Sequence, residues 1–532
     1  MCVNLSDTIF ATNRDDQIAV WYGGQELTYE KLRQETHLFA NTLKSLNIAP
    51  DDRVALLVND SPEFIAAFIS ICSLGAIAVP INMALRPEAQ MAILADCTAS
   101  FALIEADCAE KILTNASDTL PLKQVLVVDR TQDQTELVRE LKLVRPAVES
   151  RSLSEARAAV AEREPPSFPD NASDKPAFIL YTSGSTGEPK GAVHRILDLS
   201  YTNQTYCREV LQLRKGDRLF SSSRLPFAYG LGNSFTFPLF NGYTTLLCRE
   251  KPTAETISRL FHEAQPTVFF AVPVVYSLLL EYHRRVTKID CSSLRFCVSA
   301  GEALPARVGE DWEATFGVEV LDGIGSTEML HMWMSNHHGE VRYGSSGRLL
   351  SGYEAKLLDP EGKLTVAGHE GNLWVKGASA AIGYWQRPGE TARVFVDGWV
   401  RTGDLYRCDS EEYWYHMGRS DDCFKAGGQW VSPVEVEGVL LRSSQVTAVA
   451  VVEDHDEHGL PCPCAFIIKQ GLECDSAALE EELRDKCRNA LPRFKQPRRY
   501  IFTKELPYTA TGKIQRFKLR EELRNNRRPA EI

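Results

Sequence analysis

Hydrophobic and polar residues alternate with two different periods along the first 120 residues of the chain. Apolar side chains recur at near-helical spacing over residues 32–46, whereas residues 54–58 form a short apolar run rich in β-branched side chains. A second helix is predicted at 62–74 and a second buried strand at 76–79. Helices that alternate with buried strands indicate α/β layers around a largely parallel sheet.

The longest uncharged stretch, from Phe64 to Leu85, is long enough to be compared with a membrane span. Pro62 is well placed in the first turn of a helix, and Gly75 is well placed to end that helix. The apolar run after Gly75 stops at Pro80, as expected for a short buried strand. We therefore predict a helix followed by a strand, and no transmembrane segment.

The alternation of helix and strand patterns returns in the middle of the chain. Residues 253–264 predict a helix, and residues 268–272 and 294–299 predict strands. From about 340 to 416, glycines separate short aromatic and β-branched runs, which indicates antiparallel β structure. Residues 142–175 are polar and contain several prolines, so we expect a surface connection there.

A further α+β unit is predicted beyond Arg419, with about 110 residues, the usual size of a small domain. The full length of 532 residues exceeds that of a single ordinary core. The predicted fold class is therefore α/β, with a large N-terminal domain of layered sheets, a β-rich subdomain and a small α+β C-terminal domain.

Composition and charge limit the possible functions. A hydrophobic content of 44% and a charged content of 24% are those of a soluble globular protein. The formal net charge of −12 argues against a nucleic-acid partner, because nucleic acids bind basic surfaces. The 14 cysteines are scattered, and residues 1–7 lack the basic and apolar regions of a signal peptide, so we expect reduced thiols in a cytoplasm. Cys462 and Cys464 form a close pair without a second cluster, so no zinc site is expected.

The most informative segment is the loop at 181–191, Tyr-Thr-Ser-Gly-Ser-Thr-Gly-Glu-Pro-Lys-Gly, after the apolar run 177–180. Glycines let backbone N–H groups approach an anion, hydroxyl groups add donors, and Lys190 adds a positive charge. A Walker A loop needs a spacing that neither this loop nor Gly512-Lys513 provides. An ordinary turn would explain the glycines but not the dense donors, so we interpret the loop as a polyphosphate site.

The loop resembles the phosphate-binding signature of the adenylate-forming superfamily, which includes acyl- and aryl-CoA ligases, stand-alone adenylation domains and firefly luciferase. Further segments resemble the other motifs of the superfamily, in the same order. They are 299–305 along the adenine, 323–328 at phosphate and magnesium, 401–405 at the ribose, 418–422 at the hinge and 511–513 at the catalytic lysine. Two more variable segments, 227–233 and 325–331, resemble benzoate-CoA ligase and related aryl-CoA ligases.

The resemblance implies a site for ATP and Mg²⁺. The donors to the departing phosphates would be Thr182, Ser183, Gly184, Ser185, Thr186 and Gly187. Lys190 would act as a mobile cation, and Thr327 would donate to the phosphates. Glu328 would ligate Mg²⁺, a hard cation that favours carboxylates, although on the residues alone it is also compatible with a solvated glutamate.

The resemblance also implies the binding of the nucleoside. Asp404 would accept hydrogen bonds from two ribose hydroxyl groups, whereas the residues alone are equally compatible with a turn aspartate. Arg419 would reinforce the ribose or phosphate side, and Asp322 would meet the adenine amino group. The remaining wall of the adenine site would come from Gly301, Glu302, Ala303, Gly323 and Ile324.

Lys513 is implied as the catalytic lysine that bridges the substrate carboxylate and the α-phosphate. On the residues alone, a surface lysine in a loop is the simpler interpretation. The implied domains are 1–418, which holds the ATP and acid sites, and 422–532, which is mobile and carries Lys513. The hinge between them would be 419–421, with rotation at Asp421.

After rotation, the resemblance implies that another face of the C-terminal domain forms a tunnel for the pantetheine thiol. Its residues would be Lys425, Gly427 and Gly428, where glycine permits a narrow passage. The usual pattern of the superfamily is closer to Lys-Val-Ser-Gly, so Ala426 and Gly427 are departures. They bear on thiol binding and not on adenylation.

The expected acid pocket is flat and mostly apolar. Amino-acid-activating relatives carry an aspartate after the Phe of segment 227–233, but here Ala228 follows Phe227, and a buried ammonium without a partner is costly. An aromatic acid is therefore expected, in a slot formed by Ala228, Tyr229, Gly230, Gly325, His331 and Met332. Gly325 would leave space for the ring. His331 is equally compatible with a polar contact to a ring substituent and with an ordinary core histidine, so benzoate, hydroxybenzoate and aminobenzoate are not separated.

The sequence thus predicts a cytoplasmic ligase that uses ATP, Mg²⁺ and CoA to activate a small aromatic acid as its aryl adenylate. The alternative is a stand-alone adenylation enzyme that loads the acid onto the phosphopantetheine of a carrier protein. Luciferase-like oxidation would need an oxygen-dependent product. A catalytically silent binding protein is disfavoured because the full set of implied catalytic residues is present. A nucleic-acid partner is not expected, and a monomer and a homodimer remain equally open.

Overall fold

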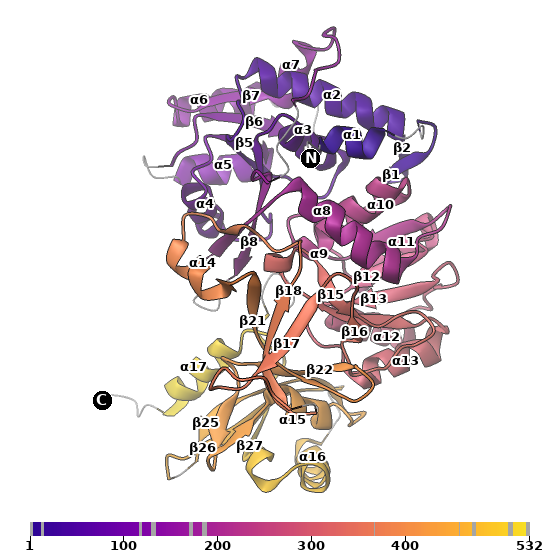
Figure 1. Ribbon diagram of the computed structural model, residues 1–532, viewed down its shortest axis with the longest axis vertical. Coiled ribbons are helices and arrows are strands. Elements are labelled where there is room, and N and C mark those ends of the chain that lie inside the picture. Colours follow the sequence, from indigo (N-terminus) through magenta and orange to yellow (C-terminus); the bar gives the residue numbers. More distant parts are fainter. Residues whose placement is uncertain are drawn as a thin grey trace.

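The computed structural model describes residues 4–11, 15–115, 120–128, 135–169, 174–183, 189–366, 368–456, 458–470, 475–508 and 514–527. Figure 1 shows α/β layers in the upper part of the molecule, β17, β18 and β21 below them, and the C-terminal elements at the lower end. The predicted α/β class, with a large N-terminal part and a smaller C-terminal part, is confirmed.

One large sheet carries the loop predicted to bind phosphate. Within the described residues it has eight strands, of which β8, β4, β3, β5, β6 and β7 run parallel. At one edge β9 pairs antiparallel with β8, and β19 pairs antiparallel with β9. In sheet order they are β19 (Gly383–Tyr384), β9 (Pro189–His194), β8 (Phe178–Ser183), β4 (Ile77–Pro80), β3 (Arg53–Leu57), β5 (Phe101–Glu105), β6 (Gln124–Val128) and β7 (Glu149–Ser152). The helices of this region are α1 (Leu5–Phe10), α2 (Tyr29–Ser45), α3 (Pro62–Ser73), α4 (Pro87–Asp96), α5 (Ala106–Asn115), α6 (Thr135–Val144) and α7 (Leu153–Ala158).

The uncharged stretch from Phe64 to Leu85 forms α3 and β4, as predicted. The hydroxyl of Ser61 accepts a hydrogen bond from the Phe64 N–H and caps α3 at its start. Gly75, at a φ of 80°, lies between the helix and β4. None of the described helices is long and apolar enough to cross a membrane.

A second large sheet carries the segments predicted to bind adenine and the acid. Within the described residues it has nine strands, with a parallel centre and antiparallel strands at both ends. In sheet order they are β16 (Arg348–Leu349), β15 (Met332–Ser335), β14 (Val320–Gly325), β13 (Phe296–Ser299), β12 (Val268–Ala271), β10 (Arg218–Ser221), β11 (Thr244–Leu247), β1 (Ile18–Tyr22) and β2 (Gln25–Thr28). Its helices are α8 (Ile196–Thr202), α9 (Ala228–Leu231), α10 (Phe237–Asn241), α11 (Ala254–Ala264), α12 (Pro273–Arg285) and α13 (Ala306–Phe316), with π-helical turns η1 (Asn203–Leu211) and η2 (Gly232–Thr236) and the 3₁₀ helix η3 (Thr327–Met329).

The two sheets share a buried core. The ring of Phe68 in α3 lies 5.6 Å from Phe178 of β8 and 5.1 Å from Phe235 of η2. These three rings are fully buried, so α3 packs both against the strand before the phosphate loop and against η2. The packing fixes the phosphate and acid regions relative to each other.

The remaining strands are antiparallel except for β27, and those before residue 416 agree with the prediction from the glycine-punctuated pattern. The β-rich sheet contains β17 (Glu354–Leu358), β18 (Glu370–Lys376), β20 (Phe395–Val396), β21 (Trp399–Cys408) and β22 (Trp414–Arg419), and α14 (Pro388–Val394) lies within it in sequence. The C-terminal elements are β23 (Phe424–Ala426), β24 (Gln429–Val431), α15 (Pro433–Leu440), β25 (Val446–His455), β26 (Pro461–Lys469), α16 (Ser476–Ala490), the 3₁₀ helix η4 (Arg493–Lys495), β27 (Arg499–Phe502) and α17 (Arg516–Arg527). β27 pairs in parallel with β26.

The predicted surface connection at 142–175 is wrong in part. Its first half supplies the edge strand β7 and the helix α7. In β7, Ser150 and Ser152 are buried while Glu149 and Arg151 are exposed. An edge strand of polar residues gives no apolar alternation, so the sequence pattern does not reveal it.

Candidate active site

The loop predicted to bind phosphate connects the antiparallel strands β8 and β9. Thr182 is paired with Lys190 across these strands, and Ser183 is opposite Pro189. Gly184, Ser185, Thr186 and Gly187 lie outside the described residues. The two strands therefore bring both ends of the loop together at one edge of the sheet, as a tight phosphate loop requires.

Lys190 lies beside a small group of polar side chains from β19 and α14. Its Nζ is 2.5 Å from Oε2 of Glu390 and 5.9 Å from the centre of the Tyr384 ring. The Lys190 ammonium, with help from Arg387, lowers the pKa of Glu390. Arg387 also pairs with Asp96 at 3.0 Å. The lysine thus lies at the active-site edge of the sheet.

Thr327 and Glu328 form the 3₁₀ turn that follows β14. Glu328 is half-buried, and its Oε1 accepts a hydrogen bond of 2.7 Å from the hydroxyl of Tyr384. Its backbone carbonyl accepts a 2.8 Å bond from the Ala381 N–H. Because Tyr384 also lies beside Lys190, this tyrosine connects Lys190, expected at the phosphates, with Glu328, expected at the metal. The interpretation of Glu328 as a merely solvated glutamate is therefore disfavoured.

Asp404 and Arg419 are cross-strand partners in β21 and β22. Nη1 of Arg419 lies 3.1 Å from Oδ1 of Asp404 and also donates to the Thr402 carbonyl. Burial lowers the pKa of Arg419, but the carboxylates of Asp404, Asp421 and Glu328 outweigh it, and the pKa is raised overall. The expected ribose residues therefore lie within electrostatic reach of the expected metal ligand.

The predicted adenine wall contacts the segment that carries the implied catalytic lysine. Gly301 adopts a φ of 95° at the turn after β13, and Glu302 follows it. Oε1 of Glu302 accepts a 2.9 Å hydrogen bond from the N–H of Ile514, the residue after Lys513. Tyr508 and Ile514 form a β-bridge that closes the loop between them. Lys513 itself lies outside the described residues, so the structure places only its neighbour at the site.

Asp322, which was predicted to contact adenine, is buried. Its Oδ2 accepts a 3.3 Å hydrogen bond from the Leu304 N–H, and burial raises the pKa of the carboxyl to about 8. Its neighbours Gly323 and Ile324 continue β14, and a Cβ at Gly323 would lie 2.6 Å from Sδ of Met332. Ala303 is half-buried at the adenine wall. The predicted contact of Asp322 with adenine stays a prediction.

The raised pKa of Asp322 has a measurable consequence for stability. The folded carboxyl keeps its proton up to about pH 8, whereas the unfolded carboxyl loses it near 3.8. The stabilisation is complete below the unfolded value and declines by about 1.4 kcal/mol per pH unit between the two values. Asp322→Asn does not titrate, so its melting temperature should rise relative to the unchanged protein between about pH 5 and pH 8. Scanning calorimetry across this range checks the result, and a constant or falling difference would contradict it.

The residues of the predicted acid pocket come from α9 and from the segment that runs from the end of β14 to the start of β15. Ala228 is buried in α9, and the hydroxyl of half-buried Tyr229 donates to the Val298 carbonyl at 3.0 Å. His331 is buried among the rings of Tyr206, Tyr229 and Phe237, with centroids 4.8, 5.7 and 4.7 Å away. Met332 is buried at the start of β15.

His331 is buried, and one of its two ring nitrogens has a hydrogen-bond partner. Its Nε2 donates to Oδ1 of Asn233 at 3.2 Å, and burial lowers its pKa to about 3. Gly232 makes room for the ring, since a Cβ there would lie 2.4 Å from Cδ2 of His331. Gly232 and Asn233 belong to the π-helical turn η2, an irregularity often found at functional sites. Nδ1 of His331 is buried with no hydrogen-bond partner among the described residues, so the core interpretation and a contact with a ring substituent both stay predictions.

The two glycines of the predicted pocket have structural reasons of their own. A Cβ at Gly325 would lie 2.6 Å from the His331 carbonyl oxygen, and one at Gly230 would lie 2.0 Å from that of Arg224. These distances are far below contact range, so the approach of two backbone segments requires both glycines. The expected reason for Gly325, space for an aromatic ring, is not needed to explain it.

The predicted thiol residues lie apart from the nucleotide residues, whereas the predicted hinge adjoins them at Arg419. Asp421 is exposed after β22, and Lys425 is exposed with its Nζ 5.2 Å from the Trp430 ring. Gly427 and Gly428, at φ values of 58° and 80°, form the turn between β23 and β24. Among the described residues, no hydrogen bond or ion pair joins this hairpin to the predicted ATP residues.

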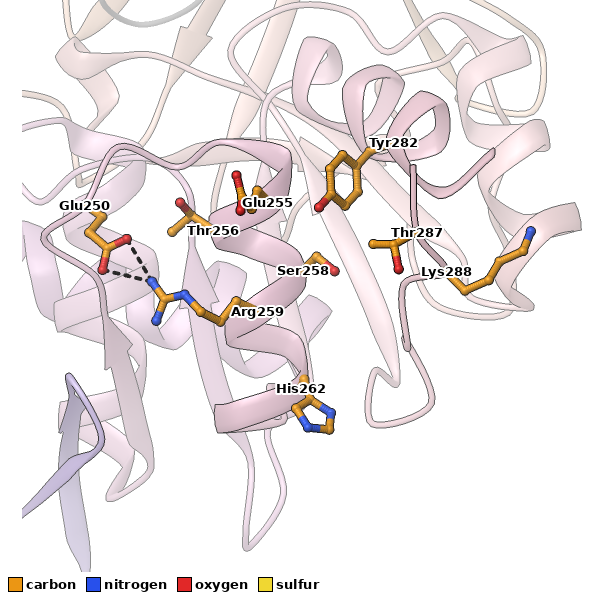
Figure 2. A pocket seen from close by; sticks show the side chains of 9 residues that line it. All are labelled: Glu250, Glu255, Thr256, Ser258, Arg259, His262, Tyr282, Thr287 and Lys288. Atoms are coloured by element: carbon orange, nitrogen blue, oxygen red, sulfur yellow. Dashed lines mark hydrogen bonds and ion pairs between the residues drawn. The ribbon is translucent and has the colours of Figure 1, made fainter. Parts of the chain in front are cut away.

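A separate surface hollow of about 510 Å³ lies beside α11 and α12, away from these residues (Figure 2). Its lining is polar, and none of the predicted site residues within the described chain contributes to it. Nη2 of Arg259 donates to both carboxylate oxygens of Glu250 at 2.8 Å, so these two charges offset each other. The hollow is not the candidate active site.

Several residues that organise the site were not predicted from the sequence. They are Asn233 beside His331, Tyr384 beside Glu328, Glu390 beside Lys190 and His194 beside Thr327. Asn233 belongs to the aromatic segment that was singled out, so its position in that segment was an available signal. The others are remote in sequence from the residues that they contact, and no local pattern marks them.

Comparisons with known proteins identify similar chains. The family model of AMP-binding enzymes matches residues 8–385, and that of the AMP-binding enzyme C-terminal domain matches residues 435–513. The chain is 39% identical over 500 residues to the benzoate–CoA ligase of Thauera aromatica, covering 93% of this chain and 90% of the relative. It is 33% identical over 520 residues to the 4-hydroxybenzoate–CoA/benzoate–CoA ligase of Rhodopseudomonas palustris, covering 98% and 93%. The solved structure of the anthranilate CoA ligase AuaEII in complex with anthranoyl-AMP has a TM-score of 0.91 and 34% identity, covering 99% of this chain and 98% of that one.

Proposed function

Because the chain belongs to the AMP-binding enzyme family, we propose that it activates an aromatic carboxylic acid with ATP and transfers the aroyl group to the thiol of CoA. The main support is the arrangement of Lys190, Tyr384, Glu328 and Arg419, which converge from four separate segments. The similarity to benzoate- and hydroxybenzoate-CoA ligases extends over nearly the whole chain and supports the class of acid.

The first half-reaction forms the adenylate. A carboxylate oxygen of the acid attacks the α-phosphorus of ATP, and the bond from that phosphorus to the pyrophosphate oxygen breaks. Lys190 and the β8–β9 loop bind the departing phosphates, and Asp404 and Arg419 hold the ribose. Lys513 bridges the two reacting anions, and Glu302 holds its neighbour Ile514 beside the adenine wall.

Glu328 suits a magnesium ion that accompanies ATP. Tyr384 binds its Oε1, and among the described residues no hydrogen bond to Oε2 is found, so this oxygen is available as a hard ligand. When bound, Mg²⁺ would neutralise phosphate charge during the displacement. Among the described residues no cluster of three His, Cys, Asp or Glu side chains forms a metal site of its own. The ion would therefore need phosphate and water oxygens as its other ligands.

The second half-reaction transfers the aroyl group. The sulfur of CoA attacks the acyl carbon, the bond from that carbon to the AMP oxygen breaks, and the thiol proton passes to solvent. We propose that residues 422–532 rotate about 419–421 between the two steps, so that Lys513 leaves and the hairpin with Lys425, Gly427 and Gly428 approaches. The separation of that hairpin from the ATP residues is compatible with a role in the second step only.

The identity of the acid is tested with acid-dependent pyrophosphate release across benzoate, hydroxybenzoates, 2-aminobenzoate, cinnamates and short and medium fatty acids. The buried, mostly apolar pocket around Tyr229 and His331 should favour an aromatic acid over fatty acids by about 100-fold in kcat/KM. Turnover confined to fatty acids would contradict the aromatic pocket. The protein with each acid omitted is the control.

The acceptor is tested by varying free CoA in the same assay. A CoA ligase should saturate with free CoA and release the aroyl thioester. The alternative, a loading enzyme for a carrier protein, should use free CoA poorly and respond to a phosphopantetheinylated carrier. The departures at Ala426 and Gly427 make this comparison necessary, because they lie in the predicted thiol tunnel.

A further inference from the structure

A buried polar hub lies beside the 3₁₀ turn Thr327–Met329, called the catalytic segment below. Its centre is Asp198 in the first turn of α8, which is fully buried. Nδ1 of His194 lies 3.0 Å from Oδ2 of Asp198, and the Arg195 N–H donates to the same oxygen at 3.0 Å. Nε of Arg195 donates to Oδ1 at 2.9 Å. A buried carboxylate is tolerated only when it is paired in this way.

His194 connects the hub to one side of the catalytic segment. Its ring is fully buried, and its Nε2 lies 2.8 Å from the carbonyl oxygen of Thr327. A carbonyl only accepts hydrogen bonds, so Nε2 is the donor to Thr327, while Nδ1 lies within hydrogen-bond distance of Asp198. The ring therefore links Asp198 to the backbone of the residue immediately before Glu328.

Arg195 connects the hub to the opposite side of the segment. Its Nη2 donates to the carbonyl oxygens of Ala378 and Ala380, each at 3.0 Å. The segment 378–384 in turn donates two hydrogen bonds to Glu328. The Ala381 N–H donates to the Glu328 carbonyl, and the Tyr384 hydroxyl donates to the Glu328 carboxylate. Both arms of the hub thus end at Glu328, one through Thr327 and one through residues 378–384.

The catalytic segment needs such support because its backbone is strained. Leu330, immediately after the 3₁₀ turn, has a φ of 65°, which is unfavourable for a bulky side chain. A strained conformation persists only where the surrounding structure holds it. Without both arms, the turn that carries Thr327 and Glu328 would be free to relax.

We propose that Asp198, acting through His194 and Arg195, is a positioning residue that sets the orientation of Glu328 toward magnesium-bound ATP. The proposal rests on the proposed function, since it assumes that Glu328 serves the metal and the phosphates. Asp198 also accepts a backbone N–H in the first turn of α8, and this capping role alone would affect only stability. Kinetic constants and ligand binding therefore separate the two roles.

The test compares Asp198→Asn with Asp217→Asn. Asp217 is also buried, pairs with Arg295 at 2.7 Å and accepts the Arg214 N–H, but it lies at the start of β10 and has no bond to the catalytic segment. We expect Asp198→Asn to lower kcat of adenylation by about tenfold or more and to raise the half-saturating Mg²⁺ concentration, as loss of a supporting residue does at metal sites. KM for the acid should change less than about twofold, because the acid pocket is not held by the hub.

Isothermal titration with ATP and Mg²⁺, without acid, supplies a readout independent of activity. Binding should weaken severalfold in Asp198→Asn and stay unchanged in Asp217→Asn. Equal kinetic and binding behaviour of the two variants, with only lower melting temperatures, would overturn the proposal. If Asp198→Asn does not fold, Arg195→Lys removes one arm at a partly exposed position and should show the same magnesium effect in weaker form; unchanged binding there would also overturn it. Failure of the unchanged protein to release pyrophosphate with any acid would instead contradict the proposed function.

Discussion

Lys513→Ala should abolish formation of the adenylate and leave thioester formation from a supplied aryl adenylate nearly unchanged. In the first step two anions, the carboxylate and the α-phosphate, must approach each other, and the lysine ammonium offsets their repulsion. Loss of one such group should reduce pyrophosphate release by about 10³-fold. In the second step a thiol attacks a neutral acyl carbon, which does not require this cation. The two rates are measured separately, with ATP and benzoate in one assay and with synthetic benzoyl-AMP and CoA in the other.

A matched control for Lys513→Ala is Lys504→Ala, which removes an exposed lysine shortly before the same loop. Both half-reactions should stay within about twofold of the unchanged protein, because a solvated lysine contributes little. If Lys513→Ala lowered both half-reactions equally, the assignment of this residue to the first step alone would be wrong. The hydrogen bond from Ile514 to Glu302 would then be kept in both half-reactions.

Glu328→Gln should have the second largest effect, a loss of about 10²- to 10³-fold in adenylation. The change keeps the shape of the side chain and its position beside Tyr384, but it replaces the charged ligand of Mg²⁺ by a neutral amide. The half-saturating Mg²⁺ concentration should therefore rise, and additional Mg²⁺ should recover part of the rate. A magnesium titration of pyrophosphate release measures both effects.

Two further variants serve as controls for Glu328→Gln. Glu340→Gln removes a carboxylate that is largely exposed and pairs with Arg348 at the surface, and it should leave adenylation unchanged. Tyr384→Phe keeps the Glu328 charge and removes only the 2.7 Å hydrogen bond to it, so its effect should be about tenfold. If Glu328→Gln lowered the rate without changing the magnesium requirement, Glu328 would be a structural residue and not a metal ligand.

The larger features of the fold follow from the sequence because they rest on local patterns. The helix α3 is fixed by Ser61 and Pro62 at its start and by Gly75 after its end. The strand β4 is a short apolar run, and β3 is apolar after Arg53. The edge strand β7 is missed because its polar residues give no apolar run. Periodicity therefore predicts buried elements well and exposed ones poorly.

The candidate catalytic residues are predicted for a different reason, since they belong to short segments that resemble a family. The groups that support them are not, because each is contributed by a distant part of the chain. Tyr384 is 56 residues from Glu328, and His194 is 133 residues from Thr327. The glycines show the same limit. Gly325 suggests space for a substrate ring in the sequence, but the structure shows a backbone crossing beside His331.

The structure also gives a physical explanation for the departure at Gly427 in the predicted thiol segment. Gly427 and Gly428 both adopt positive φ values in the tight turn between β23 and β24. Such two-residue turns favour glycine at both positions. The departure at Gly427 is therefore compatible with an intact hairpin, and its effect on CoA binding is the point that the acceptor assay resolves.

The central claim, activation of an aromatic acid as an adenylate, is tested most directly with benzoate labelled with ¹⁸O in both carboxylate oxygens. After turnover with ATP and CoA, mass spectrometry locates the label in the products. The account predicts AMP that carries one labelled oxygen, benzoyl-CoA that carries the other, and unlabelled pyrophosphate. The label enters AMP because a carboxylate oxygen attacks the α-phosphorus and stays there when the thiol displaces it. Unlabelled AMP, or ADP and labelled phosphate in its place, would contradict the adenylate mechanism.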